Sequence, residues 1–307
     1  MFKYIPTILY VKFYSVIKLA LFCLFAIPFT AYSQDGVLIV TSSDNAIYKK
    51  FQSALINKLP KNIKISQIVL ADINQETLNQ HNLIITAGYN AAKKLSSHKP
   101  STPVIYSFIP EYDNKASSPA CDNNCYKIYI NQPTPRYIKL FNILFPSGKN
   151  LVIAANKSSA DKTQNIIAAA NRSETSIKVI QINDNSNITR TFINNLTSND
   201  VLLALPNPEI YNAHTAKNII LSTYHSNVPI IAYSKSFAKA GALVSLYSGI
   251  EHIADKTANI AIKILNNNPP TEYEFYPDDF TLEINSAVAR SLNINIDTES
   301  SIKRKMR

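Results

Sequence analysis

Glycine is scarce in this chain, at only five of 307 residues. Neither a G-x-G-x-x-G turn nor a P-loop occurs, so the usual glycine-rich cradles for nucleotide phosphates are absent. The five histidines include no i, i+4 pair and no H-E-x-x-H, which leaves a zinc hydrolase without support. A G-x-S-x-G nucleophile elbow is also missing. We therefore predict a protein that is not an enzyme and that carries no metal and no cofactor.

Cysteine is also rare, at three residues. Cys23 lies in an apolar segment near the N-terminus, whereas Cys121 and Cys125 are spaced C-x-x-x-C in a polar stretch. A metal site would need further Cys or His ligands at suitable spacing, and a redox-active pair is typically C-x-x-C at a helix start. In an oxidising compartment, we expect Cys121 and Cys125 to form a short-loop disulfide.

The N-terminus has the pattern of an export signal. Three lysines accompany an apolar run at residues 19–29, and an A-x-S motif follows at residues 31–33. A positive region, a short apolar region and a small-residue motif predict a secretory signal peptide over residues 1–33, and hence a periplasmic protein. The alternative is an uncleaved membrane anchor over residues 5–29, which the lysines inside that stretch disfavour.

The formal net charge of +10 does not describe the folded body. Three lysines belong to the predicted leader and four basic residues lie in the tail, residues 299–307. What remains is close to neutral, whereas a nucleic-acid-binding domain concentrates positive charge on its surface. We therefore expect no nucleic-acid partner, and we expect the basic tail to be disordered and solvated.

Short apolar runs alternate with amphipathic segments along the rest of the chain. The predicted strands are residues 37–40, 63–68, 83–86, 104–106, 151–155, 178–182, 201–205, 229–232 and 280–284. Helical patterns follow most of these strands, and the last helix is predicted at residues 286–292. Residues 110–131 interrupt the alternation, which predicts a long loop or a lobe boundary. Two successive βαβα runs predict an α/β protein with two doubly wound, parallel-sheet lobes.

Small polar residues and tyrosines follow the ends of several predicted strands. Ligands of α/β proteins settle outside the carboxyl ends of parallel strands, where helix N-termini favour a carboxylate and tyrosines can enclose an apolar body. Taken singly, each residue is as readily a helix cap or a core tyrosine, so the prediction depends on their convergence. The predicted ligand-binding residues are Ser42, Ser43, Tyr89, Asn90, Ser107, Asn207, Tyr211, Tyr233 and Ser234.

Three motifs in the second half of the chain carry a family resemblance. They are VPIIAYS at residues 228–234, KAGAL at residues 239–243 and INSAVA at residues 284–289. They resemble the substrate-binding proteins of ABC transporters, specifically the aromatic-amino-acid-like members with the type I periplasmic binding fold. The resemblance covers roughly residues 140–296.

The resemblance implies two lobes joined by three hinge crossings, with a solute in the cleft and hinge closure around it. The crossings are expected near residues 131–135, 245–249 and 273–279. Between the predicted signal peptide at 1–33 and the basic tail at 299–307, the resemblance implies a first lobe of 34–130 plus 249–272 and a second lobe of 131–248 plus 273–298.

The implied function is a periplasmic, monomeric solute-binding protein that serves an ABC permease. Its solute is expected to be an amino acid or a similar small organic acid. The first half departs from the family pattern, and Asn207-Pro208 replaces the commoner Asp-Pro. The alternative is therefore a binding module of the same fold that signals to a membrane sensor without transport. A periplasmic enzyme without a recognisable motif comes third.

Overall fold

The computed structural model describes residues 35–111, 118–121, 124–184 and 187–307. The predicted signal peptide lies outside the described residues. Within the described ranges, no helix combines the length and the apolar composition needed to cross a bilayer.

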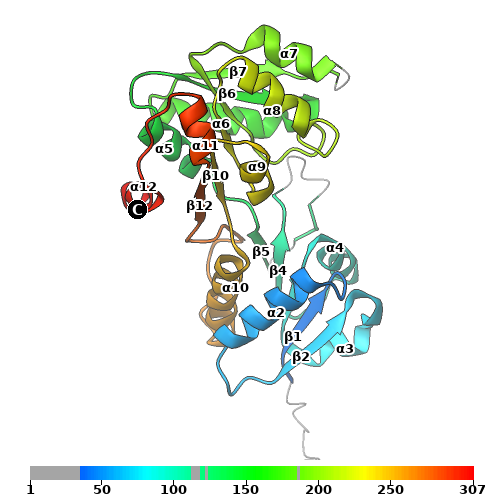
Figure 1. Cartoon of the computed structure of the whole chain (residues 1–307). Helices are drawn as coiled ribbons and strands as arrows, with labels where there is room; N and C mark the ends of the chain where they lie inside the picture. Colours follow the sequence, from blue (N-terminus) through cyan, green and yellow to red (C-terminus); the bar gives the residue numbers. More distant parts are fainter. Residues whose placement is uncertain (1–34, 112–117, 122–123, 185–186) are drawn as a thin grey trace, which may run out of the picture. The chain divides into compact units, whose positions relative to one another are not determined.

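The first lobe contains a six-stranded sheet in the order β11-β5-β4-β3-β1-β2 (Figure 1). All neighbouring strands in it are parallel. Strands β1 to β5 lie in the order β2-β1-β3-β4-β5, which is that of a doubly wound sheet, where the order of successive strands reverses next to β1. The strands are β1 (Asp35–Thr41), β2 (Ile65–Val69), β3 (His81–Ala87), β4 (Val104–Ile109), β5 (Cys125–Tyr129) and β11 (Glu274–Phe275).

Helices cover both faces of this sheet. On one face, α2 (Ala46–Lys58) and α10 (Ile250–Leu265) pack against Val37, Ile39 and Ile85. On the other face, α3 (Gln75–Asn79) and α4 (Tyr89–His98) pack against Leu38, Val40 and Ile84. Because neighbouring residues of β1 face opposite cores, the strand is apolar at every position from Val37 to Val40, as expected for a buried parallel strand.

The second lobe repeats the design with a sheet in the order β12-β10-β9-β8-β6-β7. All pairs are parallel except β10 with β12, which are antiparallel. The strands are β6 (Asn150–Ala155), β7 (Ile177–Gln181), β8 (Asp200–Leu203), β9 (Ile230–Ala232), β10 (Val244–Tyr247) and β12 (Thr281–Ile284). Its helices are α5 (Thr134–Leu144), α6 (Ala160–Arg172), α7 (Ile188–Asn195), α8 (Ala216–His225), α9 (Lys235–Ala240), α11 (Ser286–Ser291) and α12 (Glu299–Met306).

The chain crosses between the two sheets three times, close to the expected positions. It leaves β5 for α5, returns from β10 into α10, and leaves β11 for β12. Two doubly wound lobes joined by three crossings confirm the predicted fold class.

Three sequence-based expectations were wrong. The stretch 110–131 is not a long loop throughout, because it contains β5, a buried five-residue strand whose apolar signal is short and is interrupted by Lys127. The alternative prediction, a lobe boundary, fits the passage of the chain from β5 to α5. The first lobe extends past the predicted boundary at residue 273, because β11 pairs with β5 in the first sheet. The tail is not disordered but forms α12, in which Ile302 and Met306 are buried against the second-lobe core, and α11 is therefore not the last helix.

Candidate functional site

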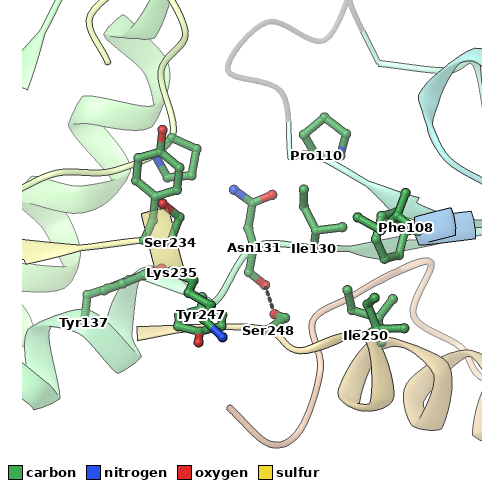
Figure 2. A pocket seen from close by; sticks show the side chains of 14 residues that line it. Phe108, Pro110, Ile130, Asn131, Tyr137, Ser234, Lys235, Tyr247, Ser248 and Ile250 are labelled. Carbon is green, nitrogen blue, oxygen red and sulfur yellow. Dashed lines mark hydrogen bonds between the residues drawn. The ribbon is translucent and has the colours of Figure 1, made fainter. Parts of the chain in front are cut away.

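A cavity of about 320 Å³ lies where strands of both sheets end (Figure 2). It is lined by the ends of β4 and β10, the starts of α2, α9 and α10, helix α5, and the loops after β5, β8 and β9. Its volume falls within the range of about 300–1,000 Å³ that is typical of small-molecule sites. The lining residues are Ile47, Phe108, Pro110, Ile130, Asn131, Tyr137, Pro206, Tyr233, Ser234, Lys235, Tyr247, Ser248, Ile250 and Ile253.

One wall is aliphatic and aromatic, and it comes from elements of the first lobe. Ile250 and Ile253 lie on the first turn of α10, and Ile130 directly follows β5. Ile47 and Ile130 are large apolar residues that remain 47% and 37% exposed. Exposed isoleucines that line a cavity can bury an apolar ligand surface. Such burial contributes roughly 25 cal/mol of favourable free energy per Å² of apolar surface removed from water.

Phe108 reaches this wall through an irregular backbone. It has a positive φ of 58°, and the pairing of β4 with β5 shifts register between Tyr106 and Ile109. The left-handed conformation is costly for a residue with a bulky side chain, and bulges of this kind redirect a side chain next to functional sites. Here the bulge turns the Phe108 ring towards Tyr48 and Phe51, with ring centroids 5.9 and 5.4 Å away.

Tyrosines of the second lobe form the facing wall. The Tyr137 hydroxyl donates to the Leu246 carbonyl at 2.9 Å, and the Tyr247 hydroxyl donates to Glu283 Oε2 at 3.0 Å. Burial and the neighbouring Glu283 carboxylate raise the pKa of Tyr247 to about 12. Both tyrosines are therefore neutral hydroxyls held by protein acceptors, and their aromatic rings are what they can offer to a ligand.

Four polar residues complete the lining: Asn131, Ser234, Lys235 and Ser248. In Figure 2, Asn131 stands between the tyrosine wall and the wall that carries Phe108, Ile130 and Ile250. Ser248 Oγ lies 3.4 Å from the Asn131 carbonyl. Within the described ranges, no group of three or more His, Cys, Asp or Glu side chains is placed to hold a metal ion.

The floor of the cavity is tied to the three crossings by hydrogen bonds. Gln132 is 3% exposed, and its Nε2 donates to Ser248 Oγ at 2.8 Å and to the Asp279 carbonyl at 3.2 Å. Arg136 donates to Gln132 Oε1 and to the Pro277 carbonyl. One residue of the first crossing thus contacts both other crossings, so a change in the hinge alters the position of Ser248 in the cavity.

Two of the nine predicted ligand residues line the cavity, Tyr233 and Ser234. Ser234 also caps α9 by accepting from the Phe237 N–H at 3.3 Å. The other predicted residues do not belong to the lining. Of these, Ser42 and Ser43 lie in the turn after β1, and Tyr89 and Asn90 are the first two residues of α4. Ser42 Oγ accepts from the Ala91 N–H at 2.9 Å.

The remaining three predicted residues have structural contacts. Ser107 is fully buried, with its Oγ 2.6 Å from Thr257 Oγ1 of α10. Asn207 Oδ1 accepts from the N–H groups of the two residues that follow Pro208, which stabilises the turn after β8. Tyr211 is 4% exposed and lines a separate hollow with Tyr233.

Several lining residues were absent from the sequence-based prediction, including Phe108, Asn131, Tyr137 and Tyr247. Asn131 and Tyr247 lie at or next to the crossings expected from the family resemblance. Placing the site at the crossings as well as at the strand ends would have found them. No sequence signal marks Phe108, because its position in the wall depends on the bulge in β4.

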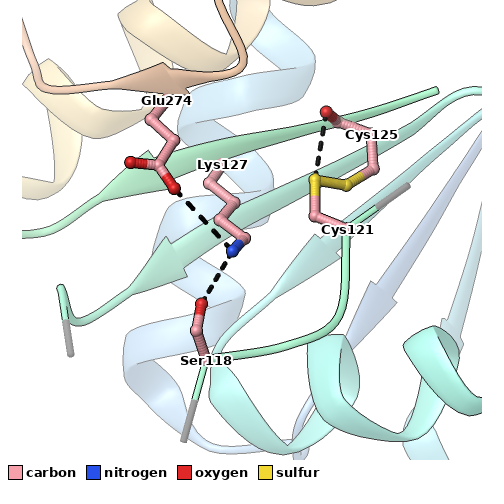
Figure 3. Close-up of a disulfide and its surroundings, with 5 residues drawn as sticks. All are labelled: Ser118, Cys121, Cys125, Lys127 and Glu274. Carbon is pink, nitrogen blue, oxygen red and sulfur yellow. Dashed lines mark hydrogen bonds and ion pairs between the residues drawn. A yellow bond between two sulfur atoms is a disulfide. The ribbon is translucent and has the colours of Figure 1, made fainter. Parts of the chain in front are cut away.

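The predicted disulfide is present between Cys121 and Cys125, with their Cα atoms 5.5 Å apart (Figure 3). It fixes the start of β5 to the segment before it. Two residues further along β5, Lys127 Nζ contacts Ser118 Oγ at 2.7 Å and Glu274 Oε1 at 3.8 Å. Burial lowers the pKa of Lys127. The bridge therefore secures a polar cluster at the edge of the first sheet, where β5 meets β11.

Comparison with known families decides the class of the protein. The model of the family described as "ABC transporter substrate binding protein" matches residues 43–305. The chain belongs to this family. The ABC transporter substrate-binding family consists of binding proteins. No curated protein matches the chain.

Solved structures confirm the periplasmic binding protein fold of this family member. A ligand-free, open substrate-binding protein with adhesive properties from Clostridium difficile has a TM-score of 0.66 at 16% identity, over 86% of this chain and 97% of that chain. A Streptococcus pneumoniae ABC domain in complex with L-Trp has a TM-score of 0.55 at 17% identity, over 88% and 98%. A conserved domain protein from Vibrio cholerae has a TM-score of 0.55 at 15% identity, over 89% and 98%.

Proposed function

We propose that this protein is an extracytoplasmic solute receptor that binds a small organic molecule in the 320 Å³ cavity and presents it to an ABC permease. The observation that carries the proposal is the origin of the lining. Residues from both lobes and from two crossings meet around one cavity, so a ligand there contacts every part that a hinge motion would displace. Family membership supports the permease as partner.

The solute expected from the sequence, an amino acid or a similar small organic acid, fits the lining in two respects. The apolar wall and the tyrosines accept an apolar body, and Lys235 provides a positive charge for a carboxylate. The pneumococcal relative was solved with L-Trp, which also combines an aromatic body with a carboxylate.

A thermal-melting screen tests the proposal directly. The purified protein is heated with amino acids, organic acids, purines and sugars, each in excess. A solute that binds only the folded state at a hundred times its dissociation constant adds about 2.7 kcal/mol of stability and raises the melting temperature. Absence of any shift across all classes would refute the receptor proposal.

Tyr233→Ala and Tyr224→Ala form a matched pair for placing the site. Tyr233 lines the cavity, whereas Tyr224 lies on α8 outside the lining and is 52% exposed. Loss of the shift in Tyr233→Ala, together with an unchanged shift in Tyr211→Ala, would place the solute in this cavity and not in the separate hollow that Tyr211 lines. Equal shifts in Tyr233→Ala and Tyr224→Ala would place it elsewhere.

Export by a cleaved leader is part of the same proposal. The basic and apolar pattern of residues 1–33 supports it. Mass spectrometry of the protein recovered from the periplasm is expected to show an N-terminus at residue 34. Recovery of the uncleaved chain with the membranes would favour the anchor instead.

A further inference from the structure

We propose that the solute is an organic anion with an apolar body and without an ammonium group, and that Lys235 is its counterion. The chemical class is that of aryl- and alkyl-carboxylates rather than zwitterionic amino acids or sugars. The inference depends on the proposed function, because it concerns the solute bound in the same cavity. It follows from which charges and which hydrogen-bonding atoms the lining provides.

The charge of the lining has one sign. Lys235 is its one cation, and none of the fourteen lining residues is an aspartate or a glutamate. A zwitterionic amino acid would place an ammonium group in a cavity whose lining carries one positive charge and no negative charge. An unpaired charge removed from water costs several kcal/mol or shifts to its neutral form, so the lining disfavours an ammonium group.

The acidic residue next to the cavity is already engaged. Glu111 follows the lining residue Pro110, but its Oε1 accepts from the Tyr276 hydroxyl at 2.7 Å. Its Oε2 lies 3.7 Å from Lys162 Nζ, in an ion pair whose side chains are only 29% and 12% exposed. An ammonium group would have to displace these partners before it could use this carboxylate.

Two other acidic residues that flank the lining are engaged in the same way. Glu283 accepts the hydroxyl of Tyr247, and Glu251, which follows Ile250, pairs with Lys58 at 3.6 Å. Glu251 thus pairs with a lysine outside the lining, and Glu283 is bound by the hydroxyl of the lining residue Tyr247. Neither carboxylate is itself part of the lining.

The neutral polar atoms of the lining also favour an anion. Asn131 Oδ1 accepts from the Glu111 N–H at 2.7 Å, and Ser234 Oγ accepts from the Phe237 N–H. Ser248 Oγ accepts from Gln132. These three acceptors are thus already in use.

The donors remain available. In the part of the chain that the structure describes, no contact uses Asn131 Nδ2 or Lys235 Nζ, and the Ser234 hydroxyl proton is not committed by its capping bond. A carboxylate accepts about four hydrogen bonds and donates none, whereas an ammonium donates three. Free donors combined with engaged acceptors therefore complement a carboxylate.

The apolar walls exclude a sugar by the same reasoning. Each sugar hydroxyl both donates and accepts, so a sugar site needs many free polar atoms around its ligand. Here ten of the lining residues are Ile, Phe, Pro or Tyr. Their rings and methyl groups suit a hydrocarbon body, and the donors gather on the few polar residues that would hold its carboxylate.

Four ligands that share a phenyl-alkyl body and differ in charge state test the inference. The probes are 3-phenylpropanoate (anion), L-phenylalanine (zwitterion), 2-phenylethylamine (cation) and 3-phenylpropanamide (neutral), titrated calorimetrically into the purified protein. We expect 3-phenylpropanoate to bind at least about tenfold more tightly than each of the others, the loss that follows from removing a hydrogen bond to a charged group. Binding of L-phenylalanine as tight as or tighter than that of 3-phenylpropanoate would overturn the inference and leave the receptor function standing.

Lys235→Met and Lys239→Met separate the counterion from general charge effects. Both lysines are exposed on α9, but only Lys235 lines the cavity. Lys235→Met is expected to weaken 3-phenylpropanoate at least about tenfold and to leave 3-phenylpropanamide unchanged, while Lys239→Met binds both like the parent protein. Equal effects of the two variants on the anion would refute the role of Lys235.

If none of the four probes binds, the inference that the solute is an aryl- or alkyl-carboxylate fails. The screen with other solute classes then decides the proposed function on its own: a shift with another class preserves the receptor, and no shift with any class rejects it as well. The melting temperatures of the unliganded variants show whether each is folded, so a loss of binding is not confused with a loss of structure.

Discussion

The two lobes share one strand order but present different chemistry to the cavity. The first-lobe elements contribute Ile47, Phe108, Ile250 and Ile253, all of them apolar. The second lobe contributes tyrosine rings together with Ser234 and Lys235. The shared topology thus brings the strand ends of both lobes to one cavity. The residues at those ends differ: the first lobe provides apolar surface, and the second provides the polar groups and the charge that orient a ligand.

The largest expected effect tests whether the lobes are separate cooperative units. Phe51 and Phe192 are both fully buried, one in each lobe. Phe51→Ala and Phe192→Ala are each expected to lower the free energy of unfolding by about 3–5 kcal/mol, because each leaves a core cavity. Urea unfolding followed by circular dichroism shows whether both variants shift the same transition. A variant that leaves every midpoint unchanged would contradict its place in the core.

The next effect concerns the apolar wall. Phe108→Ala is expected to weaken solute binding by about 1.5–3 kcal/mol, or roughly tenfold to a hundredfold, since it removes an aromatic ring that would be buried by the ligand. Calorimetric titration with the solute found in the melting screen measures the loss. Tyr224→Ala is the control. An unchanged affinity in Phe108→Ala would show that the first lobe does not supply the apolar surface.

An effect of similar size distinguishes the two lobes at the first residues of their central strands. β3 begins with His81 and β8 with Asp200, which is 1% exposed. Burial alone would raise the pKa of the Asp200 carboxyl, but hydrogen bonds from Asn150 and Thr197 and the charge of Lys178 hold it below its usual range.

Asp200→Asn is therefore expected to lower the free energy of unfolding by about 1.5–3 kcal/mol at neutral pH, the range for hydrogen bonds to a charged group. A carboxyl whose pKa is lower in the folded protein than in the unfolded chain stabilises the fold fully above its unfolded pKa of about 3.9. This stabilisation is lost as the pH falls through the folded pKa. Denaturation curves from pH 7 to pH 2 should show that the difference in the free energy of unfolding between wild type and variant decreases below about pH 4. A difference that persists at pH 2 would assign the loss to packing instead.

The smallest effect compares two fully buried serines. Ser107 of the first lobe bonds to Thr257, whereas the Ser245 hydroxyl in β10 has no partner among the described residues. Ser107→Ala is expected to destabilise the protein by about 1 kcal/mol. Ser245→Ala should change stability by less than this or increase it, because a buried hydroxyl without a partner is costly. A larger loss in Ser245→Ala would reveal a contact that the structure does not show.

Much of the fold could be predicted because buried parallel strands leave continuous apolar runs. Residues 37–40 and 151–155 fall inside β1 and β6 for this reason. The failures have a common cause. β5 and β11 are short and partly polar, and they become strands only because they pair at the edge of a sheet formed by other segments. In α12, two buried residues suffice to anchor a helix whose other positions are polar.

The candidate site could be predicted only in part. The rule that ligands lie at strand ends selected Tyr233 and Ser234, which line the cavity. The same rule selected Ser107 and Asn207, whose polar groups are used inside the protein. A serine that caps a helix and one that faces a cavity look alike in a sequence, because the difference depends on the neighbours that the fold brings to each.

The sequence by itself determined the class of fold, the two-lobe organisation, the disulfide pairing and the family. These depend on periodicity, on close spacing and on contiguous motifs, all of which are local along the chain. The tertiary structure decided where the cavity lies and what charge it carries. Phe108, Asn131, Lys235 and Ile250 come from four distant segments, and whether each side chain is free or engaged depends on contacts between residues far apart in the sequence.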